Sequence, residues 1–452
     1  MRSPARGWLR RGPAERAGRS QAVEQVLWNG HVLTLNSLLT SALGAGYWAL
    51  AAHLYNPSVV GLNYSAVAAM MLLAGLGQLN LTNVMIRFVP RAGSRVRRIV
   101  AKAYLAAFCT SVVLGTVFVL LIPTVSSGLM FLHTPLVGSG FVLAVAAYSI
   151  FVLEDGVLTG IRHPDWVVLE NLAFAVLKIA FLAALAFLAT NGILWSWAFS
   201  VAITVLLTNI YLFGRALPRR ERTAPREPAA DSGPTGGYIA ADGIAALCWL
   251  AATSILPIMV VNRLGADEAA FFSLAWLVAF LLYQLNTNMG ASLIVESANE
   301  PARLARHCRL VLRHTGALMA VAVAVLCVTA PFILRIFGSE YAEHGTGLLR
   351  LVALSALPNV VVATAVSACR ARRRMRLVVG ILATVCTLAT VLSYVLLPVM
   401  GIAGVGTGWL IAQTVVAVGL LLGRRSWIPP QEEGTDAARP PGRPEACPRD
   451  NP

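Results

Sequence analysis

Twelve stretches of about 20 or more mostly apolar residues follow one another along the chain, separated by short polar segments. They cover 32–55, 59–86, 103–123, 136–158, 166–190, 192–213, 239–262, 269–295, 315–334, 347–369, 377–399 and 401–422. A helix needs about 20 apolar residues to cross the ~30 Å hydrocarbon core of a bilayer, so each stretch predicts one membrane-spanning helix. The pattern therefore predicts an all-α polytopic membrane protein with twelve transmembrane helices.

Basic residues concentrate in every second loop of this ladder. Of the 36 Lys and Arg residues, most lie in the N-terminal segment, in alternate loops and in the C-terminal segment. Loops rich in Lys and Arg stay in the cytoplasm, so we expect both termini there and the chain in the inner (plasma) membrane. Orientation and contact with anionic membrane lipid account for the net charge of +15, and no nucleic-acid partner is expected.

Composition and loop length argue against an enzyme. A hydrophobic content of 57% and a charged content of 13% leave no room for a large soluble domain. The outer loops are short, whereas a membrane glycan polymerase or ligase needs a large catalytic one. No cofactor is expected, since the glycine-rich segment 401–408 has no preceding strand and no Lys-Ser/Thr. His307 and His314 would lie two helical turns apart, which makes a metal site with Cys308 unconvincing.

Polar segments divide the chain into five parts. We expect a basic cytoplasmic tail with a short interfacial helix (1–30), a first six-helix bundle (31–214), a cytoplasmic linker (215–237), a second six-helix bundle (238–424) and a disordered cytoplasmic tail (425–452). Because the linker divides the spans six and six, and six is an even number, both bundles would have the same orientation in the membrane.

Short matches between the two bundles recur at a nearly constant spacing of roughly 206–209 residues. Gln78-Leu79-Asn80 matches Gln284-Leu285-Asn286, Arg162 matches Arg370, and Gly192-Ile193 matches Gly401-Ile402. We therefore predict two parallel six-helix repeats around a central cavity, an arrangement that suits alternating access.

Two polar stripes interrupt the apolar spans. Asn80, Asn83 and Arg87 share one helical face at the end of the second span. In the eighth span, Gln284, Asn288, Ser292 and Glu296 follow one another in steps of four. Because polar groups in contact with lipid are costly, both stripes should face protein or water. They either form hydrogen bonds between helices or line a cavity whose amides bind sugar hydroxyls.

Lys178 is the deepest charge, about 13 residues or ~19 Å into the fifth span. A central charge costs ~2.5–3.5 kcal/mol on insertion scales, so it needs a partner or water. The nearest acids, Glu154, Asp155 and Glu170, lie closer to the cytoplasmic ends of their spans. Lys178 therefore either faces an aqueous cavity, where it would bind an anionic group such as a phosphate, or snorkels or pairs after helix tilt.

Further charges form a rim near the cytoplasmic ends of the spans, including Asp155, Arg162, Asp242 and Glu296. Such a rim is typical of gates that close alternately, and these four residues are our predictions for gating or coupling. Ordinary anchoring at the membrane interface gives the same pattern. Asp242 has a third interpretation, as the binding site of a coupling Na⁺ or H⁺.

Several segments carry a family resemblance. The first span runs Leu35-Asn-Ser-Leu-Leu-Thr-Ser-Ala-Leu-Gly-Ala-Gly-Tyr-Trp48, and the second closes with Ile86-Arg-Phe-Val-Pro90. An inner turn reads Leu153-Glu-Asp-Gly-Val-Leu-Thr-Gly-Ile-Arg162, and the last span opens with Gly401-Ile-Ala-Gly404. With the six-plus-six layout, roughly 30–424 resembles the multidrug/oligosaccharidyl-lipid/polysaccharide exporter superfamily, and within it the polysaccharide flippases (Wzx-like, the O-antigen and teichoic-acid export group).

The resemblance implies a flippase that moves a polyprenyl-pyrophosphate-linked glycan to the outer leaflet for cell-surface polysaccharide synthesis. It implies a lipid-linked oligosaccharide as substrate, and glycan synthesis and export proteins as partners. Predicted contacts are Lys178 and Arg87 to the pyrophosphate, and Asn80, Asn83, Gln284 and Asn288 to the sugars. Cavities in that family are richer in Arg, whereas in this chain Lys178 is the one basic residue deep in a span.

Three alternatives stay open. A cation-coupled multidrug exporter of the same superfamily would be expected to need acids deep in its helices, and the sequence shows few. A membrane glycan polymerase or ligase would need the large outer loop that the chain lacks. The remaining alternative is a scaffold of an envelope-synthesis complex.

Overall fold

The computed structural model describes residues 40–188, 190–223, 236–299 and 304–428, and within these ranges the chain is helical, with no strand. Residues 40–54 form the described part of the first predicted span. The helices that follow are α2 (Pro57–Gly77), α3 (Leu81–Phe88), α4 (Val96–Val125), α5 (Pro135–Gly160), α6 (Pro164–Ala184), α7 (Gly192–Tyr211), α8 (Leu217–Thr223), α9 (Gly236–Leu264), α10 (Ala266–Asn299), α11 (Leu304–Arg335), α12 (Ser339–Ala371), α13 (Met375–Met400) and α14 (Ile402–Leu422).

Eleven helical segments in the described residues are long and apolar enough to cross a membrane. They coincide with the second to the twelfth predicted spans. The predicted fold class, an all-α polytopic membrane protein, is confirmed. The expected tail and interfacial helix over 1–30 lie outside the described residues.

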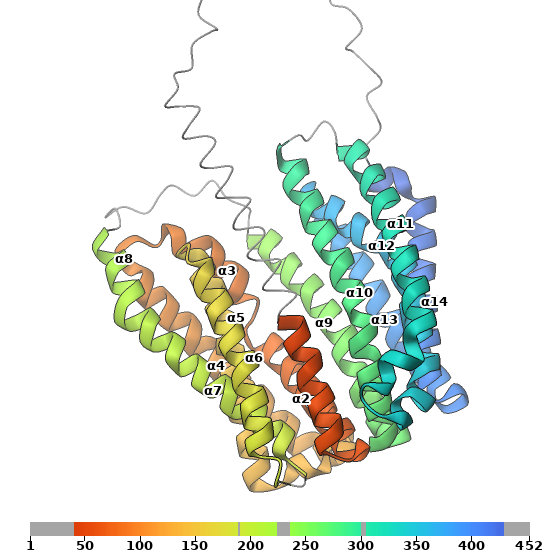
Figure 1. The fold of residues 1–452 in the computed structure, drawn as a ribbon. Helices are drawn as coiled ribbons and strands as arrows, with labels where there is room; N and C mark the ends of the chain where they lie inside the picture. The colour runs from red at the N-terminus through yellow and green to blue at the C-terminus, as the bar shows by residue number, and fades with distance from the viewer. Residues whose placement is uncertain (1–39, 189, 224–235, 300–303, 429–452) are drawn as a thin grey trace, which may run out of the picture.

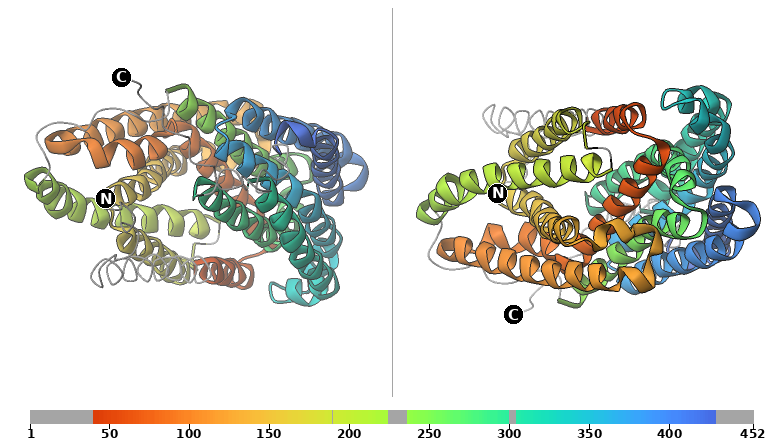
Figure 2. Two further views of the ribbon diagram at one scale, coloured as in Figure 1. Left: turned by 90° about the horizontal axis from the view of Figure 1, so that it is seen from above. Right: turned by 90° about the horizontal axis from the view of Figure 1, so that it is seen from below.

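The helices form two groups with α2 and α9 between them (Figure 1). We call residues 40–223 the first half and 236–428 the second half. The two groups lean apart toward the end of the molecule where α8 ends and α9 begins, which we call the linker end (Figure 1). Views along the helices also show the groups as separate bundles (Figure 2).

Both halves pack their helices in the same order. In the first half α3 and α4 pack on α5, and α5 and α6 pack on α7. In the second half α10 and α11 pack on α12, and α12 and α13 pack on α14. Equivalent helices therefore make equivalent contacts, as two parallel repeats require.

The turns after α5 and α12 also share one geometry. Arg162 has a φ of 65°, and the next N–H, of His163, donates to the carbonyl of Leu158 at 3.0 Å. Arg373 has a φ of 56°, and the N–H of Arg374 donates to the carbonyl of Cys369 at 2.8 Å. Both are Schellman caps, which end a helix with a left-handed residue. By turn geometry the counterpart of Arg162 is Arg373, three residues beyond the Arg370 of the sequence match.

The halves meet most closely at the end opposite the linker end. A Cβ on Gly61 of α2 would clash with the backbone of α10 at Ala266 and Ala270. The carboxamide oxygen of Asn262, at the end of α9, accepts from Ser126 Oγ at 2.9 Å and from the N–H of Gly128 at 3.1 Å. Backbone contact and hydrogen bonds together close the molecule at this end.

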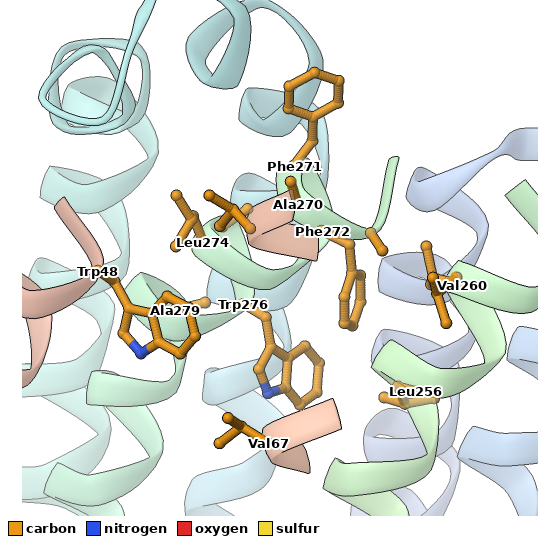
Figure 3. Close-up of a cluster of buried hydrophobic side chains, with 14 of the residues drawn as sticks. Trp48, Val67, Leu256, Val260, Ala270, Phe271, Phe272, Leu274, Trp276 and Ala279 are labelled. Carbon is orange, nitrogen blue, oxygen red and sulfur yellow. The ribbon is translucent and has the colours of Figure 1, made fainter. Parts of the chain in front are cut away.

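A continuous apolar core crosses the boundary between the halves. Trp48 and Val67 come from the first half and lie beside Trp276 of α10 (Figure 3). Leu256 and Val260 of α9 belong to the same buried cluster. Large side chains from both sides stabilise this junction through close packing, because lipid tails are as apolar as these side chains and burial away from lipid gives no hydrophobic gain.

Three boundaries differ from the sequence expectation. The linker expected over 215–237 is helical up to residue 223, where α8 ends. The second predicted span (59–86) is not one helix, because Leu79 and Asn80 have left-handed φ values of 53° and 58° and separate α2 from α3. Ordered structure also continues past residue 425, where the disordered tail was expected to begin. Trp427 is buried there, and its carbonyl accepts a hydrogen bond from Arg372 at 3.1 Å.

Candidate functional site

A cavity of about 410 Å³ lies between the two halves. Its walls come from the helix over 40–54 and from α2, α6, α7, α9 and α10. Six aromatic side chains line it, three from each half: Trp48, Tyr64, Trp197, Trp249, Trp276 and Phe280. Among its described lining residues Lys178 is the one with a charge. We call this space the shared cavity.

Lys178 lies with its ammonium group among three aromatic rings. Its Nζ is 4.8 Å from the ring centroid of Trp197, 5.1 Å from that of Tyr47 and 5.2 Å from that of Phe174. An ammonium over an aromatic face gains about 0.5–2 kcal/mol, more when water is excluded. We call these three rings the lysine cage.

Hydrogen bonds and packing hold the cage in place. Tyr47 and Ser196 share a hydrogen bond of 2.7 Å between their hydroxyls, which fixes the Tyr47 ring against α7. Phe174 packs edge-on against Trp197, with ring centroids 5.4 Å apart. In the part of the chain that the structure describes, Lys178 forms no ion pair. Aromatic rings rather than a carboxylate therefore stabilise this buried cation, whose side chain is 7% exposed.

Two carboxyl groups near the linker end of the first half are buried within the protein. Glu154 of α5 is fully buried and Glu170 of α6 is 3% exposed, and the two side chains are neighbours. Asn209 of α7 donates a hydrogen bond to Glu154. No basic group among the described residues pairs with either carboxyl.

Aromatic rings separate the carboxyl pair from the ammonium group of Lys178. Glu170, Phe174 and Lys178 follow one another in steps of four on one face of α6, so Glu170 and Lys178 are ~12 Å apart along the helix. Phe174 packs on Phe151 of α5 with centroids 5.1 Å apart. The ammonium group of Lys178 is thus kept apart from the two buried carboxyl groups.

A second cavity of about 280 Å³ lies within the second half, lined in part by Trp249, Thr287, Asn359 and Arg370. Beside it, Asn286 donates to the side-chain oxygen of Asn359 at 2.9 Å, and Asn359 donates to that of Gln413 at 3.3 Å. We call these three residues the amide network. It ties α10, α12 and α14 together.

Two residues of the first predicted polar stripe, Asn80 and Asn83, form hydrogen bonds to α9. Asn80 donates to the carbonyl of Ile239 at 2.8 Å, and its side-chain oxygen accepts from Asn83 at 2.9 Å. Asn83 also donates to Asp242 at 3.3 Å, and Asp242 forms an ion pair of 3.3 Å with Arg370. This polar chain joins α3 of the first half to α9 and α12 of the second.

The other predicted residues lie apart from the shared cavity. Arg87 is half-buried in α3, and Gln284 and Asn288 are exposed on α10. Asp155 accepts a hydrogen bond of 3.3 Å from Asn171, and Arg162 is exposed in its turn. Glu296 lies in the last part of α10, where side chains are outside the description. Of the nine predicted site residues whose side chains the structure describes, only Lys178 lines the shared cavity.

Sequence reasoning did not identify the aromatic walls of the cavity. A spacing of four between Phe174 and Lys178 was visible in the sequence, and it indicates an aromatic ring one turn from the charge. Tyr47 and Trp197 come from distant segments that only the fold brings together.

No protein-family model matches the chain, and no curated protein matches its sequence. Solved structures do share its fold. An inward-facing conformation of a multidrug resistance MATE family transporter of the MOP superfamily matches with a TM-score of 0.62 at 16% identity, covering 86% of this chain and 94% of that chain. An outward-facing conformation of such a transporter matches with a TM-score of 0.55 at 16% identity, covering 88% and 92%. A MATE structure in the straight conformation matches with a TM-score of 0.53 at 17% identity, covering 88% of this chain and 93% of that chain.

The described helices therefore define a polytopic helical membrane protein built from two six-helix halves around a shared cavity. At this level of identity the likeness shows the fold alone, and that fold is the one of MATE transporters of the MOP superfamily. The likeness agrees with the sequence expectation at the level of the fold.

Proposed function

We propose that the chain is an exporter, not an enzyme, and that it moves small amphiphilic compounds, neutral or anionic, across the membrane by alternating access. One observation carries the proposal: the shared cavity takes its walls from both halves. A cargo bound there would contact both, so a change in their relative position would change the side from which the cargo is reached.

The lining supports this class of cargo. A volume of about 410 Å³ is within the range of small-molecule sites, which are mostly apolar with few polar groups. Six aromatic side chains suit a flat apolar body, and Lys178 suits a negative group at its edge. The fold likeness to a multidrug resistance transporter supports the same cargo class.

The charge pattern supports a direction. The basic loops favour a cytoplasmic position for the linker end and for both termini. The halves are joined by backbone contact at the opposite end, and the TM-score is higher for the inward-facing than for the outward-facing transporter. We take the structure as the state that receives cargo from the cytoplasm.

A second candidate, the flipping of a polyprenyl-pyrophosphate-linked glycan, is favoured by a basic hollow at the start of α4. Arg95, Arg97 and Arg98 line this space of about 650 Å³, together with one carboxylate, that of Glu221. Below it the outer face of α4 is apolar and exposed, as at Leu105 and Phe108. Such a surface suits a pyrophosphate head with a prenyl chain.

In this second candidate the side chains predicted to contact sugars and pyrophosphate keep the roles that the resemblance implies. They are Lys178 and Arg87 for the pyrophosphate, and Asn80, Asn83, Gln284 and Asn288 for the sugars. The partners in that case are glycan synthesis and export proteins.

The two candidate functions are distinguished in cells from which this protein has been deleted and in which either wild type or Lys178→Gln is then restored. We expect wild type to lower the retention of an anionic lipophilic dye, and Lys178→Gln to lose most of that effect. Lys178→Arg, which keeps the charge, is the matched control.

Lipid-linked glycan intermediates are measured in the same cells. If they accumulate without the protein and dye retention does not change, the flippase is correct and the small-molecule exporter is wrong. If neither quantity responds to wild type, both functions are excluded.

A further inference from the structure

The lysine cage has the geometry of a receptor for an organic ammonium ion. Three rings surround one Nζ at centroid distances of 4.8, 5.1 and 5.2 Å. They come from three separate helices, the one over 40–54, α6 and α7. Aromatic cages of this kind bind quaternary and methylated ammonium ligands in other proteins, because ring faces attract a desolvated cation.

Here the cage is occupied by a side chain of the chain itself. Lys178 reaches it from α6, is 7% exposed and also lines the shared cavity. Within the described residues no carboxylate pairs with its charge, and the nearby Glu170 is ~12 Å away along α6 with Phe174 between. A second cation in the cavity would therefore meet an uncompensated positive charge.

We propose that Lys178 determines the charge specificity of the shared cavity by occupying, as a tethered ammonium, a cage that otherwise binds organic cations. The inference rests on the proposed function insofar as it takes the shared cavity as the cargo site. The lysine has two effects on a cationic compound: it fills the aromatic site that would attract the compound, and it repels the compound. A repulsion between unit charges about 5 Å apart at an effective dielectric constant of 20 weakens binding on the order of 100-fold.

Removing the lysine side chain tests the cage directly. Lys178→Ala deletes three carbons and one nitrogen, the same heavy atoms that n-propylammonium contains. We expect millimolar n-propylammonium chloride to raise the unfolding temperature of purified full-length Lys178→Ala by several degrees, since a ligand that binds only the folded state stabilises it. Wild type should not respond, because its cage is filled.

Lys178→Met is the matched control, since it removes the charge but fills the space. It should not respond to n-propylammonium. If folded Lys178→Ala does not respond, or all three proteins respond equally, the cage is not an organic-cation site and the inference is overturned. Lys178→Ser, which leaves nearly the same space, replaces the alanine variant if that variant does not fold.

Specificity is tested with a larger cation. Tetraphenylphosphonium binding is followed by quenching of tryptophan fluorescence, because three of the cavity aromatics besides Trp197 are tryptophans. We expect Lys178→Ala to bind it at least ten-fold more tightly than wild type and Lys178→Arg. Equal affinity in all three would contradict the role of the charge.

These binding measurements use purified protein and do not depend on export. A wild type that exports nothing in cells, with a cage that responds as described, would overturn the proposed function and leave the cage intact. If wild type exports anionic dyes but n-propylammonium does not stabilise Lys178→Ala, the proposed function stands and the inference about the lysine cage is overturned.

Discussion

The buried amide side chain of Asn286 joins two helices of the second half, whereas the exposed amide of Gln284 lies outside this contact. Asn286 lies 2% exposed in α10 and donates both to Asn359 and to the carbonyl of Ala356. Gln284, two residues earlier on the same helix, is exposed. A buried polar group that loses its partner costs about 1–3 kcal/mol, so the two positions should respond differently to substitution.

We predict that Asn286→Leu lowers the free energy of unfolding by about 1–3 kcal/mol, because it leaves Asn359 without its donor. Gln284→Leu, the matched control on the same helix, should change it by less than about 0.5 kcal/mol. Thermal unfolding of both purified variants beside wild type measures the difference. Equal losses would mean that the amide network contributes nothing to stability.

At the scale of the element, one tripeptide adopts two conformations. Gln78-Leu79-Asn80 interrupts the second span, whereas Gln284-Leu285-Asn286 continues α10 as a regular helix. The interruption is stabilised from outside: Asn80 bonds to Ile239 of α9, and Gly243 leaves room for it, since a Cβ there would lie 2.7 Å from the Asn80 side chain. Asn286 bonds instead to α12.

We predict that Leu79→Gly stabilises the protein by about 0.5–1 kcal/mol. A left-handed conformation costs a non-glycine residue about 1–2 kcal/mol. Glycine avoids this cost, but it loses more conformational entropy on folding than leucine does, which offsets part of the gain. Leu79 is 55% exposed, so little burial is lost. Ile86→Gly, at a helical position of α3, should instead destabilise by about 1 kcal/mol. A lower unfolding temperature for Leu79→Gly would show that this break is not left-handed.

These elements show what the sequence could predict. Hydropathy located every described membrane helix, because a bilayer requires a long apolar run whatever lies beside it. The break at Leu79 was missed, since its cause is a contact with a segment about 160 residues away. Lys178 was found because a lone charge in an apolar run is conspicuous, but its cage was not, because aromatic residues in membrane helices usually signify packing alone.

At the scale of the whole molecule, small residues allow the two halves to touch at the end opposite the linker end. Gly61 lets α2 touch α10, and Gly128 lies against Val261 and Asn262. Both contacts lie at the end opposite the linker end, and both require a missing side chain. Alternating access would require this junction to separate while the linker ends approach one another.

A side chain at Gly61 should therefore shift the molecule toward the other state. Its Cβ would lie 1.9 Å from the carbonyl oxygen of Ala266, a distance that only separation of the two helices can relieve. We predict that Gly61→Val forces this end open and brings the starts of α4 and α11 several ångströms closer. Gly316→Val is the control, because a Cβ there meets nothing within 4 Å.

Spin labels on cysteines at Arg98 and Arg306, in a chain without its native cysteines, report that distance by pulsed electron spin resonance. Both positions are exposed and lie on opposite halves at the linker end. We expect a shorter distance in Gly61→Val and no change in Gly316→Val. A distance that stays the same in folded Gly61→Val would mean that the halves do not rock about the shared cavity. The cavity would then be a fixed pocket, and transport by alternating access would be wrong for this chain.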